Sequence, residues 1–425
     1  MKVGPIQVEI SERGRAARLK DAVLASFYEA RPSVEARLRE FNVRDWKRAK
    51  YWLDVSGLAL YFFERIEAMH LETCLPESLL LELRANLEEN RRRTAALLEE
   101  AVKVTQALCH LGIECAVLKG ATFPSESVPD PTLRSQMDLD LLIREADIGR
   151  TEACLAGFGY SLDAASGGTW EFKAGPSGKS SLKNLYQVRP ERALEVHVQQ
   201  DGLHGVHPDR LARSEWRLIR GHLLPALSPA ELFLLQGRHL FKHMCSEHTR
   251  ASWVLEFWRH ITARRNDVAF WREVECLAAE EPGSAVAVGA AVQLTSLIFG
   301  PCAPCELARW SIDKLPTGIC LWIHLYGRRI LLSRRPGSKL YLLLRREVNR
   351  NSAAEKSERR RLLLPFHRPQ RITRKADQES VFWTLRRIWI EIRFTVRRLR
   401  FHVWEGCALA FESIRWQRRN GGLSQ

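Results

Sequence analysis

Two aspartates stand close together in an apolar run near residue 140. Asp138 and Asp140 are separated by one leucine, and on a strand both would project from the same face because side chains alternate. Carboxylates about 6–7 Å apart along a strand repel each other, so such a pair is usually kept where a cation lies between them. Hard divalent cations bound through oxygen fit that role. The alternative is an acidic, solvated edge strand.

A third carboxylate lies on a later apolar run at 194–198. Glu195 and His197 would share one face of that strand. Together with Asp138 and Asp140, Glu195 outlines a site for two metal ions. We expect its carboxylate within about 5–6 Å of the other two, given the reach of Mg²⁺ ligands. We expect His197 on the same face but further from the metals.

A turn at Lys119-Gly120 follows the first apolar run, 113–118. Glycine lets the backbone approach a ligand closely, and a helix N-terminus directly after the turn would favour phosphate. Arg134 lies on the loop that leads into the aspartate strand, four residues before Asp138. We interpret the turn as a cradle for the phosphates of a nucleotide, with Lys119 or Arg134 adding positive charge.

A helix is predicted from Ser228, because Ser228-Pro-Ala-Glu231 forms a capping box with proline at the first helical position. His239, Lys242 and His243 would share one face of this helix. One interpretation places that face over the nucleotide, with Lys242 near a phosphate. The other is a solvated face or a packed histidine pair.

These motifs follow one another along the chain. They read LKGATF at 118–123, PDPTLRSQMDLDLLI at 129–143, GFGY at 157–160 and LEVHV at 194–198. In this order they resemble the uncharacterised nucleotidyltransferase family of bacteria, within the polymerase-β-like superfamily. The resemblance extends over roughly residues 20–310. The phosphate turn of the superfamily ends in Gly or Ser, whereas this chain has Ala121, so that serine hydroxyl is absent.

The resemblance implies a metal-dependent nucleotidyltransferase, which joins a nucleoside monophosphate from an NTP to an acceptor hydroxyl and releases pyrophosphate. Asp138, Asp140 and Glu195 would be the catalytic ligands of Mg²⁺ or Mn²⁺. The residues expected to bind the nucleotide are Lys119, Gly120, Arg134, Lys242 and His243.

Two other functions stay open at this stage. One is a nucleotide-binding or scaffold protein without transfer activity, and the other is an RNA-directed transferase that uses a basic tail. The converging carboxylates argue against the first, because unused like charges in one pocket cost stability. The acceptor of a transferase is left open between a sugar, a peptide, a protein and RNA.

The predicted fold class is α+β, with a small mixed β-sheet nucleotidyltransferase core flanked by N-terminal and C-terminal helical modules. A chain of 425 residues with 45% hydrophobic residues is long enough for two or three domains. The expected domains are an N-terminal helical region 1–110, an α/β core 111–205, a helical domain 206–310 and a basic, mostly helical region 311–425.

Apolar patterning within the core predicts individual elements. The expected strands are about 113–118, 138–143, 168–174, 183–189 and 193–198. Long helices are expected at 79–111 and 145–158, and the Gly- and Ser-rich stretch 163–181 reads as a hairpin-forming or mobile loop.

The net charge of +15 comes from the end of the chain. Residues 318–425 hold 25 Lys and Arg against 8 Asp and Glu, and the rest is close to neutral. The N-terminal segment lacks the apolar region of a signal peptide, so we expect a cytoplasmic protein.

Residues 380–401 predict a basic amphipathic helix with one apolar stripe. The stripe includes Leu385, Ile388, Ile392 and Val396, with arginines largely elsewhere. A helix of this kind can contact an anionic membrane or nucleic acid. We expect instead that the stripe docks on the body of the protein and is buried, because an exposed stripe of this length invites aggregation.

Overall fold

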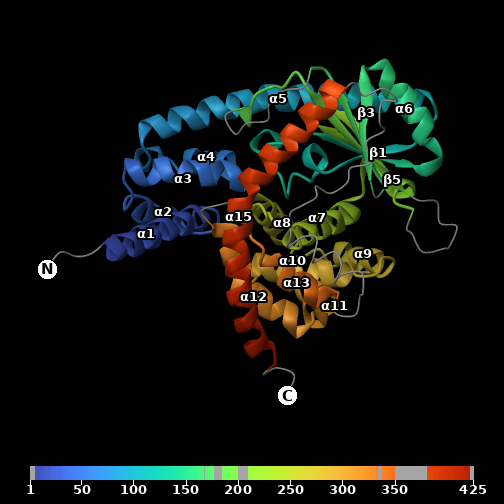
Figure 1. Cartoon of the computed structure of the whole chain (residues 1–425). Coiled ribbons are helices and arrows are strands. Elements are labelled where there is room, and N and C mark those ends of the chain that lie inside the picture. The colour runs from blue at the N-terminus through green and yellow to red at the C-terminus, as the bar shows by residue number, and fades with distance from the viewer. Residues whose placement is uncertain are drawn as a thin grey trace.

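The protein combines a mixed β-sheet with helices that precede and follow it in the chain, as the computed structural model shows (Figure 1). This arrangement confirms the predicted α+β class, a sheet core flanked by helical modules. The structure describes residues 5–166, 168–176, 184–199, 209–333, 337–349 and 381–421.

The N-terminal helices end in a long helix that reaches the sheet. They are α1 (Pro5–Ala25), α2 (Arg31–Leu38), α3 (Val43–Ser56), α4 (Ala59–Ala68) and α5 (Glu77–His110). In α5, Leu83 and Leu87 pack in the core shared by the helices, whereas Val104 and Leu108 pack under the sheet. Because leucines recur at helical spacing along its 34 residues, α5 joins the two cores, as its course in Figure 1 shows.

Seven strands form the described sheet, in the order β3-β4-β5-β2-β1-β7-β6. They are β1 (Cys115–Leu118), β2 (Leu139–Arg144), β3 (Tyr160–Ser166), β4 (Thr169–Ala174), β5 (Arg192–Gln199), β6 (Ser214–Ile219) and β7 (His222–Leu227), with helix α6 (Ile148–Gly157) between β2 and β3. Strand β2 lies at the centre, antiparallel to β1 and parallel to β5. Its inward residues Leu139, Leu141 and Ile143 are buried, which leaves the opposite face for Asp140.

The sheet corrects part of the strand prediction. Described residues 184–189 contain no strand. Strand β4 confirms the strand predicted at 168–174, and it forms a hairpin with β3, which begins at Tyr160, before the stretch 163–181 that we interpreted as a hairpin-forming or mobile loop. Strands β6 and β7 were not predicted. Pro225 lies inside β7 and lacks the N–H that a strand interior normally uses, which argues against a strand from sequence. Strand β4 alternates polar and apolar residues, whereas β7 reads HLLPAL and does not. The pairing of β7 with β1 and β6 therefore decided that strand.

A second set of helices follows the sheet. These are α7 (Pro229–Met244), α8 (Ala251–Ala263), α9 (Val268–Ala279), α10 (Ser284–Phe299), α11 (Cys305–Trp310), α12 (Thr317–Leu332) and α13 (Tyr341–Val348). The predicted cap of α7 is confirmed, since the Ser228 side chain accepts a hydrogen bond from the Glu231 backbone N–H. One hydrophobic cluster joins these helices to α1–α5, with Phe62 and Phe257 both fully buried in it.

Helix α15 (Val381–Gly421) is the last element and the red helix of Figure 1. The docking predicted for its apolar stripe is wrong where the structure describes the side chains. Leu385, Ile392 and Val396 are 61%, 56% and 64% exposed; the Ile388 side chain lies outside the described residues. The helix docks instead by its opposite face and further along, where Leu409 and Trp416 are buried. Among the described helices, none is both long and apolar enough to cross a membrane.

Candidate functional site

The parallel pairing of β2 with β5 brings two of the three predicted carboxylates together. Asp140 lies directly opposite Glu195 in the register. The ligand atoms of Asp140, Glu195 and His197 all lie within 4.8 Å of one another. The expected closeness of Glu195 to Asp140 is thus found, but His197 is a member of the group and does not stand further away.

Asp140 is the most strongly held carboxylate of the group. Lys119 Nζ donates a hydrogen bond to Asp140 Oδ1 at 2.8 Å, and His197 Nε2 lies 2.9 Å from the same oxygen. Burial alone would raise the pKa of Asp140, but His197 and Lys119 outweigh it and hold that pKa below its usual value. Because an ionised carboxylate only accepts hydrogen bonds, His197 donates through Nε2 and can accept at Nδ1 from Thr169, 3.3 Å away.

Asp138, at the entrance to β2, has the opposite electrostatic character. Burial, followed by the charges of Asp140 and Glu195, raises the pKa of Asp138 to about 6, against the opposing effect of Lys119. Asp138 lies directly before β2 and is not among the close ligand atoms of Asp140, Glu195 and His197, but the charges of Asp140 and Glu195 act on it. The site is acidic beyond what Lys119 neutralises, which is the electrostatic condition for binding a cation.

The Lys119-Gly120 turn differs from the expected phosphate cradle. Both residues have positive φ, at 57° and 56°, a conformation that is strained for lysine. A Cβ on Gly120 would lie 1.8 Å from Oε1 of Gln136, so a larger residue would have to displace that amide, and the positive φ adds strain for any residue with a Cβ. The turn continues into a three-residue 3₁₀ helix, Gly120–Thr122, and not into an α-helix. The predicted helix N-terminus at this turn was wrong.

Arg134 lies beside the site but is already engaged. Its Nε lies 3.2 Å from Oε1 of Glu256, and both side chains are largely buried. Tyr61 donates a second hydrogen bond to that carboxylate at 3.0 Å. The charge of Arg134 also acts on Asp138, where it opposes part of the rise in the pKa of that carboxyl. This pairing makes Arg134 a fixed positive charge near the carboxylates.

Two arginines that sequence reasoning did not assign place positive charge near the carboxylates: Arg93 is buried and Arg250 is half-buried. Arg93 of α5 is 7% exposed, and burial, together with Arg189, lowers its pKa to about 10. Burial and Arg134 also lower the pKa of Arg250. Asp138 opposes both shifts, so both guanidinium groups lie within its field. Among described residues, no carboxylate forms an ion pair with Arg93 or Arg250. In the sequence, the helical spacing of apolar residues in α5 was the signal that could have indicated that Arg93 faces inward.

His243 of α7, next to Lys242 in sequence, belongs to an aromatic group with His239 of α7 and Trp253 of α8. The His243 ring lies 4.5 Å from His239 and 4.2 Å from Trp253, measured between centroids. Burial, with the charge of Lys242, lowers the pKa of His243 to about 4, so this ring is neutral at pH 7. Lys242 is exposed. The packed histidine pair that the sequence analysis left open is therefore present, and Lys119 and Arg134 also act on His239.

The geometry of the acidic group fits a small divalent cation. Ligand atoms of one Mg²⁺ lie at most about 4.2 Å apart, because each bond is about 2.0–2.1 Å long. The observed limit of 4.8 Å needs only a small contraction of the side chains. Carboxylate oxygens suit Mg²⁺ and Mn²⁺, and the imidazole of His197 is the one softer donor.

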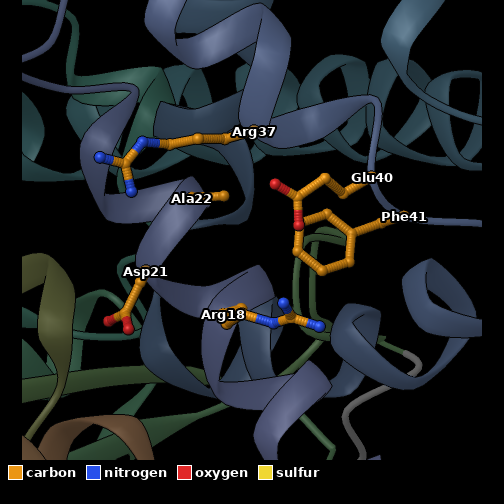
Figure 2. A pocket seen from close by; sticks show the side chains of 6 residues that line it. All are labelled: Arg18, Asp21, Ala22, Arg37, Glu40 and Phe41. Carbon is orange, nitrogen blue, oxygen red and sulfur yellow. The ribbon is translucent and has the colours of Figure 1, made fainter.

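A pocket of about 120 Å³ lies elsewhere, between α1 and α2 (Figure 2). Its charged lining residues are of both signs: Arg18, Asp21, Arg37 and Glu40. Arg37 is already paired with Glu29 at 3.0 Å. None of the carboxylates on β2 and β5 lines this pocket, and it has no part in the site.

Comparison with known proteins gives a family and a distant structural likeness. The model of the family described as "Uncharacterised nucleotidyltransferase" matches residues 42–300. No curated protein matches the chain. The chain is similar to a crystal structure of an antigenic nucleotidyltransferase-like protein from Paracoccidioides brasiliensis, at 14% identity and a TM-score of 0.28, over 49% of this chain and 94% of that one. With most of its length matched by the family model, the chain belongs to the uncharacterised nucleotidyltransferase family.

Proposed function

We propose that this protein is a metal-dependent nucleotidyltransferase that transfers a nucleoside monophosphate from an NTP to an acceptor hydroxyl. The observation that carries the proposal is the convergence of Asp140, Glu195 and His197 within 4.8 Å, with Asp138 directly before β2 and in the field of Asp140 and Glu195. Membership of the nucleotidyltransferase family supports it. The alternative, nucleotide binding without transfer, gives no role in catalysis to the gathered carboxylates, where burial and then the charges of Asp140 and Glu195 raise the pKa of Asp138.

Asp138, Asp140 and Glu195 would hold Mg²⁺ or Mn²⁺, with His197 positioning Asp140. When bound, the ions supply charge neutralisation for the triphosphate and orientation of its α-phosphorus. In the transfer, a bond forms between the acceptor oxygen and the α-phosphorus while the bond to pyrophosphate breaks. The acceptor proton passes to a carboxylate of the site or to water.

The positive groups around the carboxylates would hold the triphosphate. Arg93 is buried and Arg250 is half-buried, both within the field of Asp138, and neither has a carboxylate partner among described residues. Arg93 donates a hydrogen bond to the backbone carbonyl of Leu185, a neutral partner. A phosphate oxygen would give each guanidinium a charged partner through charge-assisted hydrogen bonds. Lys119 lies at the inner edge of the same site, on Asp140.

The experiment is incubation of the protein with each NTP labelled at the α-phosphate, with Mg²⁺ or Mn²⁺ and with cell extract, followed by identification of the labelled species. We expect label on an acceptor from the unaltered chain and none from Glu195→Gln. Treatment of the extract with ribonuclease or protease then separates RNA, protein and small-molecule acceptors. NTP binding without any transferred label would favour the non-transferring alternative.

A further inference from the structure

Helix α15 carries an apolar stripe that is exposed along its length. The outer stripe consists of Leu385, Trp389, Ile392, Val396, Leu399 and Val403, each between 53% and 64% exposed. Its members are spaced alternately four and three residues apart, which places them on one face of a helix. An apolar face this continuous is uncommon on a protein surface without a binding role.

The opposite face of α15 fixes the stripe in its outward direction. Glu412 bonds to Tyr326 and Arg329 of α12, and the buried Trp416 packs against Tyr326. Arg398 pairs with Glu247. Rotating the stripe inward would break all these contacts. The outer stripe therefore does not pack on the body of the protein in this arrangement.

The charge beside the outer stripe is positive. Arg386, Arg393 and Arg400 recur every seven residues, each directly after a member of the stripe. The Arg393 guanidinium lies over the ring of Trp389, 4.5 Å from its centroid. Over residues 381–403 the sequence holds six arginines and one acidic residue, Glu391. Long basic side chains beside an apolar face can keep their charges at the polar boundary while the face is buried.

The positive charge beside the outer stripe distinguishes between the partners that could cover it: a second copy of α15, another segment of the same chain, or a lipid surface. A second copy of α15 would bring arginine rows together, since Glu391 is the single acid available to pair with them. Segment 350–380 of the same chain holds nine Lys and Arg against four Asp and Glu, so it too would repel. A lipid bilayer with anionic headgroups complements both the apolar residues and the arginines, because it has an apolar interior beneath a negatively charged surface.

We propose that the outer stripe of α15 binds an anionic lipid surface, with the helix lying in the plane of the interface. The stretch 385–403 covers about 27 Å at 1.5 Å per residue. The apolar residues enter the acyl boundary and the arginines bind lipid phosphates. Each arginine near such a surface contributes about 1 kcal/mol, an affinity factor of about five, which salt screens.

The test is co-sedimentation of the full chain with vesicles of phosphatidylcholine alone or mixed with phosphatidylglycerol. We expect binding to the anionic vesicles only, weakened at high salt. The variant Ile392→Glu with Val396→Glu should lower the affinity at least tenfold. The matched control is Leu218→Glu with Leu223→Glu, on the exposed hairpin of β6 and β7, which should bind like the unaltered chain.

Circular dichroism and melting temperature check that each variant folds, which is expected because all four positions are exposed. Equal binding to both kinds of vesicle, or none, overturns the proposal. A dimer in sedimentation analysis, or RNA binding, that is lost in the Ile392/Val396 variant while vesicles are not bound, also overturns it. Asp140→Asn should bind vesicles normally, so the result is independent of nucleotidyl transfer.

Discussion

Lys119 and Asp140 form a nearly buried ion pair, with Nζ 2.8 Å from Oδ1 and side-chain exposures of 18% and 5%. This pair joins the end of β1 to the centre of β2 and places a fixed ammonium group within the acidic site. A divalent cation that binds Asp140 must compete with Lys119 and His197 for the same carboxylate. When a divalent cation binds Asp140, it would take the place of the Lys119 ammonium group as the positive charge beside that carboxylate.

Replacing Lys119 by methionine should destabilise the metal-free protein by about 2 kcal/mol at pH 7. Removing one partner of a buried pair costs about 3–5 kcal/mol, and His197 still stabilises Asp140. Because the pKa of Asp140 is lowered, this stability exists above its unfolded pKa and is lost as pH falls through the folded value. Denaturant unfolding at pH 7 and pH 3 measures it. Lys173→Met, at a more exposed pair, should cost under about 1 kcal/mol.

Asp138→Asn should stabilise the metal-free protein at pH 7 to 8. The pKa of Asp138 is raised to about 6, so its contribution to stability is largest below the unfolded pKa and is lost as pH rises through 6. An asparagine escapes that loss, which is worth about 3 kcal/mol for a shift of this size. Melting temperature against pH in a chelator is the measurement. The gain should vanish near pH 4, and a gain that is constant with pH would contradict the assignment.

Combining Asp138→Asn with Asp140→Asn should abolish the dependence of NTP binding on Mg²⁺ or Mn²⁺. The fold should persist, because both substitutions keep the side-chain volume, and the repulsion removed at Asp138 offsets part of what is lost when the Lys119–Asp140 pair is broken. Isothermal calorimetry with and without metal gives the answer. Asp163→Asn, at an ion pair on β3, is the matched control and should keep the metal effect. Unchanged metal dependence in the double variant would place the site elsewhere.

Arg93→Gln and Arg250→Gln should each weaken binding of inorganic tripolyphosphate or NTP by roughly 10- to 100-fold, the value of a charge-assisted hydrogen bond. Neither should lower the free energy of unfolding much in the absence of ligand, because the loss of the Arg93 hydrogen bond to Leu185 is offset by the removal of a charge that has no carboxylate partner among described residues. Arg92→Gln is the neighbouring control, since Arg92 pairs with Glu89 on the exposed face of α5. Loss of stability with unchanged affinity would indicate a structural role.

The sequence of this protein determined which residues belong to the site and which local elements carry them. The alternation around Asp138 and Asp140 predicted a strand with one acidic face, and Glu195 was identified in the same way. Strand periodicity, the Ser228 cap and the long leucine pattern of α5 are local signals. They can be recognised in the sequence because they depend on residues that are close together in the chain. The roles of these residues as metal ligands remain predictions.

Tertiary structure decided the partners of those residues. The register that sets Asp140 opposite Glu195, the hydrogen bond from His197, and the engagement of Arg134 by Glu256 all join residues distant in sequence. The same holds for Arg93, whose burial beside Asp138 depends on how α5 crosses the sheet. In α15 the amphipathic pattern was visible, but two faces of the helix are apolar. Only the packing of Leu409 and Trp416 on the body selected which face became buried and which stayed exposed.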